Sequence, residues 1–193
     1  MKNVLKIVFL GIVGFGLLVY LTAPEQPHTN KKIDKNIKLT SSLLPSHFEV
    51  IGVAGYMKKD DIFKKENRKY IIVLNHDALS LVEPLKSTNR KDIVLVANIS
   101  KTPWFIKKLA VNGKLAELNE KSTIPMINDT SGDLTKALSI SDDTQTKYFI
   151  FKIQEDDSIL KIKESEVKKG ALEFGITKEE SSKYIEFLLS FLK

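Results

Sequence analysis

The 193-residue chain contains no cysteine. This absence excludes disulfide bonds, catalytic thiolates, cysteine-ligated zinc and iron–sulfur clusters together. It is compatible with export to an oxidising compartment, where an unpaired thiol is prone to unwanted pairing. Thiol chemistry is therefore outside the functions that this sequence supports.

Dense basic clusters and the common cofactor motifs are also missing. The formal net charge is +6, but the lysines are scattered among Asp and Glu, without the basic stripe and interleaved aromatics of a nucleic-acid surface. The sequence has no His-x-x-x-His spacing, no phosphate-binding glycine loop and no Gly-x-Ser-x-Gly elbow. We therefore expect no nucleic-acid partner, no metal and no cofactor.

One long apolar run is present at the N-terminus. Lys2 and Lys6 precede residues 7–23, which carry no charged side chain. A stretch of about 17 residues is near the lower limit for a membrane-spanning helix. Pro24 follows the small residue Ala23, which makes signal-peptide cleavage unfavourable and favours an uncleaved anchor over a secreted or periplasmic product. The basic start favours a cytoplasmic N-terminus, although lysines also follow the run.

These features predict a single-pass protein of the bacterial inner membrane whose folded part faces the periplasm. Residues 1–23 are expected to form the transmembrane anchor and residues 24–42 a polar linker. Residues 43–193 remain for one α/β domain of about 150 residues, enough to bury a core.

Apolar patterns within that domain alternate between strand and helix types. Strands are expected at residues 48–54, 70–74, 93–99, 124–127, 147–154 and 159–163, and helices at 78–86, 104–120, 132–139 and from 177 onward. Thr177 and Glu180 have the spacing of a capping box at the start of the last helix. The alternation predicts a largely parallel sheet with a late antiparallel hairpin.

Two stretches resemble the thioredoxin-like superfamily, especially its membrane-tethered TlpA-like and peroxiredoxin-like branches. They are residues 124–138 (IPMINDTSGDLTKAL) and the strand, acidic turn and strand of residues 148–159. The resemblance covers residues 43–193 and implies a thioredoxin-like sheet with flanking helices. It describes a scaffold and assigns no activity.

Two departures from that family bear on function. Asn75-His76-Asp77-Ala78-Leu79 stands where redox members place Cys-x-x-Cys, and Thr144-Gln145-Thr146-Lys147 stands where they place a cis-proline. The chain is thus similar to cysteine-free members, and neither disulfide exchange nor peroxide reduction is expected.

His76 and Asp77 are the only candidate catalytic residues, because they follow a strand at the edge where open α/β sheets bind ligands. An imidazole beside a carboxylate can act as a base. The structural alternative is that Asp77 caps the next helix and His76 packs at its start.

For residues 129–133 the spacing departs from a calcium loop, so a turn and helix cap is expected. Trp104, the only tryptophan, is a candidate partner-binding residue or a core residue.

The sequence thus favours a non-enzymatic domain that binds another envelope protein as an assembly or accessory factor. The alternative is an enzyme that uses Asn75, His76 and Asp77 at the lost redox site. A purely structural spacer is a third interpretation.

Overall fold

The computed structural model describes residues 39–63, 69–101 and 112–192. The predicted anchor, most of the predicted linker and Trp104 lie outside the described residues. Within the described ranges, no helix combines the length and apolar character needed to cross a membrane.

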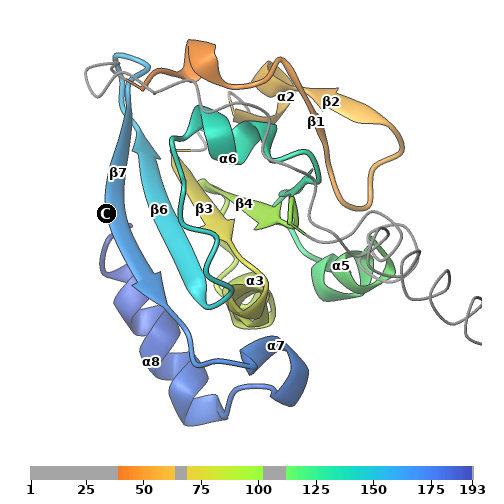
Figure 1. Ribbon diagram of the computed structural model, residues 1–193, viewed down its shortest axis with the longest axis vertical. Coiled ribbons are helices and arrows are strands. Elements are labelled where there is room, and N and C mark those ends of the chain that lie inside the picture. The colour runs from red at the N-terminus through yellow and green to blue at the C-terminus, as the bar shows by residue number, and fades with distance from the viewer. Residues whose placement is uncertain (1–38, 64–68, 102–111, 193) are drawn as a thin grey trace, which may run out of the picture.

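A five-stranded mixed sheet in the order β5-β4-β3-β6-β7 forms the centre of the molecule (Figure 1). Strands β3, β4 and β5 are parallel, β6 is antiparallel to β3, and β7 is antiparallel to β6. Every residue of β3 is buried, as expected for an apolar run covered on both faces. The strands are β3 (Tyr70–Leu74), β4 (Ile93–Asn98), β5 (Met126–Asp129), β6 (Lys147–Ile153) and β7 (Ile159–Glu166).

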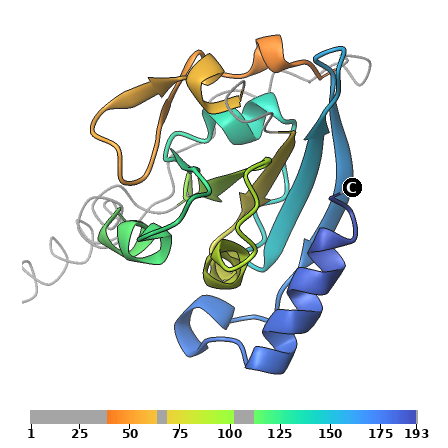
Figure 2. The same ribbon diagram turned by 180° about the vertical axis from the view of Figure 1, so that it is seen from behind.

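Helices cover one face of the sheet, and shorter elements cover the other (Figures 1 and 2). The first face packs its buried side chains, including Ile72 and Leu74, against a 3-10 turn at Asp77–Leu81, α3 (Val82–Lys86), α5 (Asn112–Asn119), α7 (Ala171–Phe174) and α8 (Lys178–Leu189). The second face packs Ile71 and Val73 with side chains of α2 (Lys59–Phe63), α6 (Asp133–Ala137) and β1 (His47–Glu49). The alternation along β3 therefore supplies two cores.

The sheet order and the flanking helices fit a thioredoxin-like fold, as the sequence predicted. The expected strands at residues 70–74, 93–99, 124–127, 147–154 and 159–163 are confirmed with small shifts in their ends. The capping box is confirmed as well: the Thr177 side chain accepts from the Glu180 N–H, and the Glu180 carboxylate accepts from the Thr177 N–H.

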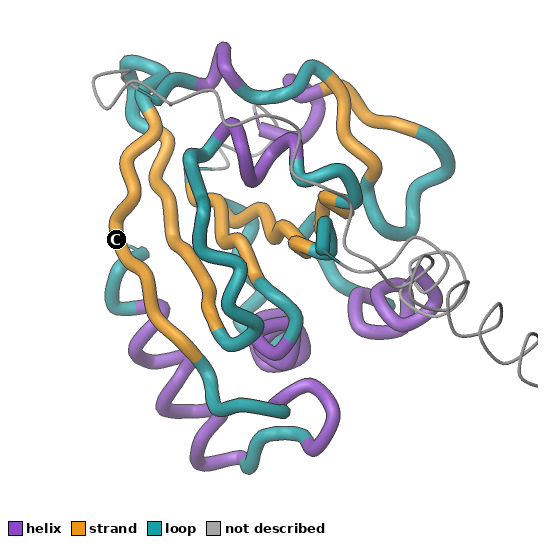
Figure 3. The backbone as a smooth tube through the Cα atoms, in the orientation of Figure 1, coloured by secondary structure: helices purple, strands orange, loops and turns teal. Residues whose placement is uncertain are grey.

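The expected strand at residues 48–54 is wrong. The chain forms a hairpin there, in which β1 pairs with β2 (Tyr56–Lys58). Gly52 and Gly55 have φ values of 82° and 81° in the connection, a left-handed conformation that glycine adopts without the clash of a Cβ atom. Figure 3 shows this connection as a long loop between two short strands. The apolar residues of this segment predicted a continuous strand, but Gly52 and Gly55 produce a turn there.

Residues 39–41 pair with the start of β7. The Ile159 N–H donates to the Leu39 carbonyl at 2.8 Å, and the Ser41 N–H donates to the Asp157 carbonyl at 2.9 Å. Thr40 and Ser158 form an antiparallel bridge. These residues fall within the range expected to be linker, so the folded body begins before residue 43.

Candidate functional site

The carboxyl ends of β3 and β4 are joined by a chain of side-chain hydrogen bonds. Asn75, which follows β3, is 2% exposed, and its Oδ1 accepts from Asn98 Nδ2 at 2.8 Å. Asn75 Nδ2 donates to the Thr144 carbonyl at 2.9 Å. On β4, Asn98 Oδ1 accepts from Ser100 Oγ at 2.8 Å. Asn75 therefore links both central strands to the loop that precedes β6.

The chemistry of Asn75 follows from these contacts. Its carbonyl oxygen and its amide nitrogen are both used in hydrogen bonds within the fold. A carboxamide is neither titratable nor nucleophilic at neutral pH. Asn75, the first residue after β3, is thus a side chain that holds the structure together.

Asp77 is buried and joins two distant segments. Its Oδ2 accepts from the Gly170 N–H at 2.8 Å, and its own N–H donates to the Gln145 carbonyl at 2.8 Å. The expectation that Asp77 caps the next helix is wrong, because His76 is the N-cap residue and makes no side-chain cap hydrogen bond. The carboxylate instead stabilises the turn before α7, where Gly170 has a φ of 73°.

His76 is the accessible member of this group. Its side chain is 44% exposed, and its Nδ1 lies 3.1 Å from Asp77 Oδ1. His76 Nδ1 and Asp77 Oδ1 are within hydrogen-bonding distance, so the buried carboxyl group orients the imidazole ring. The structure thus brings the two predicted candidates into contact, with one side chain in solvent and the other in the core.

In the part of the chain that the structure describes, no metal centre accompanies this pair. In residues 39–63, 69–101 and 112–192, no group of three or more His, Cys, Asp or Glu side chains is placed to hold a metal ion. The Asp129 carboxylate instead accepts from the Leu134 N–H at 3.2 Å and from the Thr135 N–H at 2.8 Å. The helix-cap interpretation of residues 129–133 is therefore confirmed.

Just before α6, Gly132 lies so close to Ser100 that a Cβ on it would be 2.9 Å from the serine Cβ.

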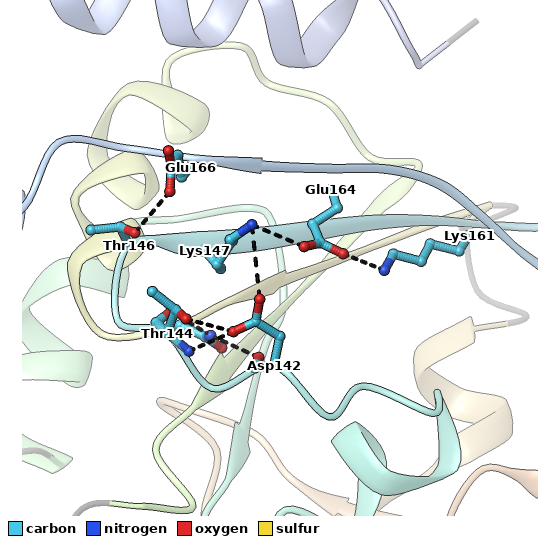
Figure 4. Close-up of polar contacts among 8 residues, drawn as sticks. Asp142, Thr144, Thr146, Lys147, Lys161, Glu164 and Glu166 are labelled. Carbon is cyan, nitrogen blue, oxygen red and sulfur yellow. Dashed lines mark hydrogen bonds and ion pairs between the residues drawn. The ribbon is translucent and has the colours of Figure 1, made fainter. Parts of the chain in front are cut away.

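A network of charged side chains holds the loop before β6 from the other side (Figure 4). Lys147 Nζ lies 3.0 Å from Glu164 Oε1 and 3.8 Å from Asp142 Oδ2. Glu164 also receives a hydrogen bond from Lys161, and the two lysines lower the pKa of its carboxyl group. Hydrogen bonds from Thr144 lower the pKa of Asp142, while Glu164 raises that of Lys147.

The sequence analysis missed this network, because its partners are far apart in the chain. The only available signal was the sequence of β7, where two lysines are followed by two glutamates. Trp104, the predicted partner-binding residue, lies outside the described residues, so its role stays a prediction.

The fold and the site together define a mixed α/β protein that fits a thioredoxin-like fold and has no cysteine. No family model and no curated protein sequence matches the chain. Among solved structures, it is similar to the mitochondrial 2-Cys peroxiredoxin from Plasmodium falciparum at 10% sequence identity, over 74% of this chain and 89% of that one, with a TM-score of 0.37.

Proposed function

We propose that this protein is a membrane-anchored, periplasm-facing domain that binds another envelope protein and serves as an assembly or accessory factor. One observation carries the non-catalytic part of the proposal. Asn75 begins the segment that, by the resemblance to the thioredoxin-like superfamily, stands where redox members place Cys-x-x-Cys. It is 2% exposed, and both polar atoms of its side-chain amide are hydrogen-bonded within the fold. The fold is kept at this position, but no redox side chain is present there. A contact surface is therefore the function that the domain supports best.

The loop before β6 is the part of this surface that we expect a partner to contact. Gln145 is exposed, while the backbone on either side of it is fixed by Asn75 and by the Asp77 N–H. A rigid backbone with an exposed side chain loses little conformational entropy on binding.

The experiment uses the full chain in its own membrane. A photoreactive residue replaces Gln145, and a control places the same residue at Glu155, which is exposed in the turn at the opposite end of β6. We expect a defined cross-linked product from position 145 that position 155 does not give. Equal products from both positions, or none from either, would contradict the proposal.

The predicted orientation is tested separately. Because the natural chain lacks cysteine, a Gln145→Cys variant carries one thiol only. A membrane-impermeant maleimide should label it in intact spheroplasts. Labelling that requires lysed cells would place the domain in the cytoplasm and refute the orientation.

The contact between His76 and Asp77 favours a second candidate function, an enzyme that uses Asn75, His76 and Asp77. The half-exposed imidazole, 3.1 Å from a buried carboxylate, has the arrangement of an oriented general base. Hydrolysis of activated esters by the wild type, His76→Ala and the control His47→Ala tests it. Loss of hydrolysis in His76→Ala alone would support the enzyme, and equal rates in all three would dismiss it.

A further inference from the structure

The hairpin of β1 and β2 ends in an exposed tip that carries no charge. Residues 50–57 (VIGVAGYM) contain no charged side chain, and within them residues 52–56, which we call the tip, are all exposed. Val53 is 47% exposed and Tyr56 is 72% exposed. Single exposed apolar residues are ordinary on a protein surface, whereas an exposed run without a charge indicates a contact surface.

The tip stands clear of the rest of the described chain. A Cβ atom on Gly52 or on Gly55 would meet no atom of the described residues within 4 Å. Figures 1 and 2 show the hairpin on the side of the molecule away from β7. The tip is therefore accessible to a large, flat partner.

The base of the hairpin is held firmly by the central fold. Phe48 of β1 is buried, with 4% exposure. Directly after β1, Val50 bridges to Ile127, and the Ile51 N–H donates to the Met126 carbonyl at 2.9 Å. A tip on a fixed base loses little conformational entropy when it meets a surface.

The chemistry of the tip and its flank fits the headgroup region of a bilayer. Tyr56 has an apolar ring and a polar hydroxyl group, and tyrosine is enriched at membrane–water interfaces for this reason. Lys58, at the end of β2, is exposed and attracts anionic headgroups. The acidic residues Asp60 and Asp61 come after β2, in α2, which limits the lipid contact to the tip.

The predicted anchor brings the tip within reach of this interface. The apolar run ends at residue 23, and the described part of the chain begins at residue 39. About 16 residues span at most about 55 Å, so the folded body stays close to the bilayer that holds the anchor. Because both contacts belong to one chain, a weak second contact forms at a high effective concentration.

We propose that the tip of the β1–β2 hairpin docks into the headgroup region of the lipid bilayer, with Val53 and Tyr56 in contact with lipid. The anchor and the docked tip then hold the domain at two points, which restricts its orientation on the membrane. This proposal rests on the membrane anchoring proposed above and adds a second site of contact.

A fluorescent dye on a single thiol tests the docking in the full chain, reconstituted in vesicles of phosphatidylethanolamine and phosphatidylglycerol. Because the chain has no cysteine, Val53→Cys carries the only thiol for an environment-sensitive dye. We expect blue-shifted emission and quenching by lipids with a nitroxide near the headgroup. The matched control, Leu160→Cys, replaces an aliphatic side chain of similar exposure on β7 and should show neither change. Equal quenching at both positions would overturn the proposal.

A substitution at Tyr56 tests whether the tip itself makes the lipid contact. Tyr56→Ser, introduced with Val53→Cys, removes the ring that we place at the interface. Because the side chain is exposed, the melting temperature should stay nearly unchanged, while lipid quenching at position 53 should fall. Tyr56→Trp should retain the quenching, since tryptophan shares the interfacial preference. Undiminished quenching in Tyr56→Ser would overturn the docking.

A third labelled position separates the docking from the anchoring. Phe15→Cys places the same dye within the predicted anchor. Lipid quenching at position 15 with an aqueous dye at position 53 would retain the anchor and overturn the docking. An aqueous dye at position 15 with lipid quenching at position 53 would refute the anchor and support the docking. Blue-shifted emission at position 53 without lipid quenching would mean that protein covers the tip, which also overturns the docking.

Discussion

Replacing Asn75 with alanine removes the link between the central strands and the loop before β6. Two well-formed hydrogen bonds are lost, at 2.8 Å to Asn98 Nδ2 and at 2.9 Å to the Thr144 carbonyl. Each neutral hydrogen bond contributes about 1 kcal/mol net, and a buried partner left unsatisfied costs about 1–3 kcal/mol. We therefore expect the free energy of unfolding to fall by about 2–4 kcal/mol, which lowers the melting temperature by roughly 5–15 °C for a chain of this size.

Chemical denaturation and thermal melting followed by circular dichroism measure this change. Gln145→Ala is the control, because it removes an exposed amide side chain from the same loop and should alter the unfolding free energy by less than about 0.5 kcal/mol. If Asn75→Ala is no less stable than Gln145→Ala, the side chain does not hold the loop, and the structural role assigned to it is refuted.

Three further perturbations test other contacts. Lys168 and the Thr177 N–H lower the pKa of Glu180 from 4.5 to about 2. The charge of Glu180 therefore stabilises the fold above pH 4.5, and this contribution is lost as the pH falls through 2. Melting temperatures of the wild type and Glu180→Gln should converge over that interval, and a constant difference would contradict the assignment. Gly132→Ala places a Cβ at φ 74° and 2.9 Å from a serine Cβ and should cost at least about 1 kcal/mol, whereas Gly113→Ala, with nothing within 4 Å, should add about 0.5–1 kcal/mol; denaturation curves compare the two. Asp77→Ala removes the carboxylate that accepts a hydrogen bond from the Gly170 N–H. Hydrogen exchange at that amide should therefore accelerate, and unchanged protection would show that the carboxylate does not hold the turn.

The sheet was predictable because its strands carry their own signal. Residues 70–74 and 93–98 are continuous apolar runs, and a strand buried on both faces needs no other feature. The hairpin of β1 and β2 was not predictable from hydrophobicity, because residues 50–54 are as apolar as a strand. Their conformation follows from Gly52 and Gly55, whose positive φ values reverse the chain. The apolar pattern of this segment therefore predicted neither the turn nor the exposure of its side chains, since Val53 is 47% exposed.

The site was predictable only in part, for a similar reason. The position of residues 75–77 after a central strand is a local property, and the sequence located it. The most distant partners of Asn75 and Asp77 are 69 and 93 residues away. Both partners are backbone groups, Thr144 O and Gly170 N–H, and a backbone group has no residue type to recognise. Contacts of this kind become visible only when the fold brings the segments together.

The three residues at the end of β3 divide between the core and the solvent, and this division limits what the site can do. Asn75 and Asp77 are each 2% exposed, and their polar atoms are committed to hydrogen bonds within the fold. His76, between them, is the only one whose side chain reaches solvent to a large extent. A molecule that binds at this strand end therefore meets the His76 imidazole and the loop before β6, and any variant of Asn75 or Asp77 acts on function through the position of those two surfaces.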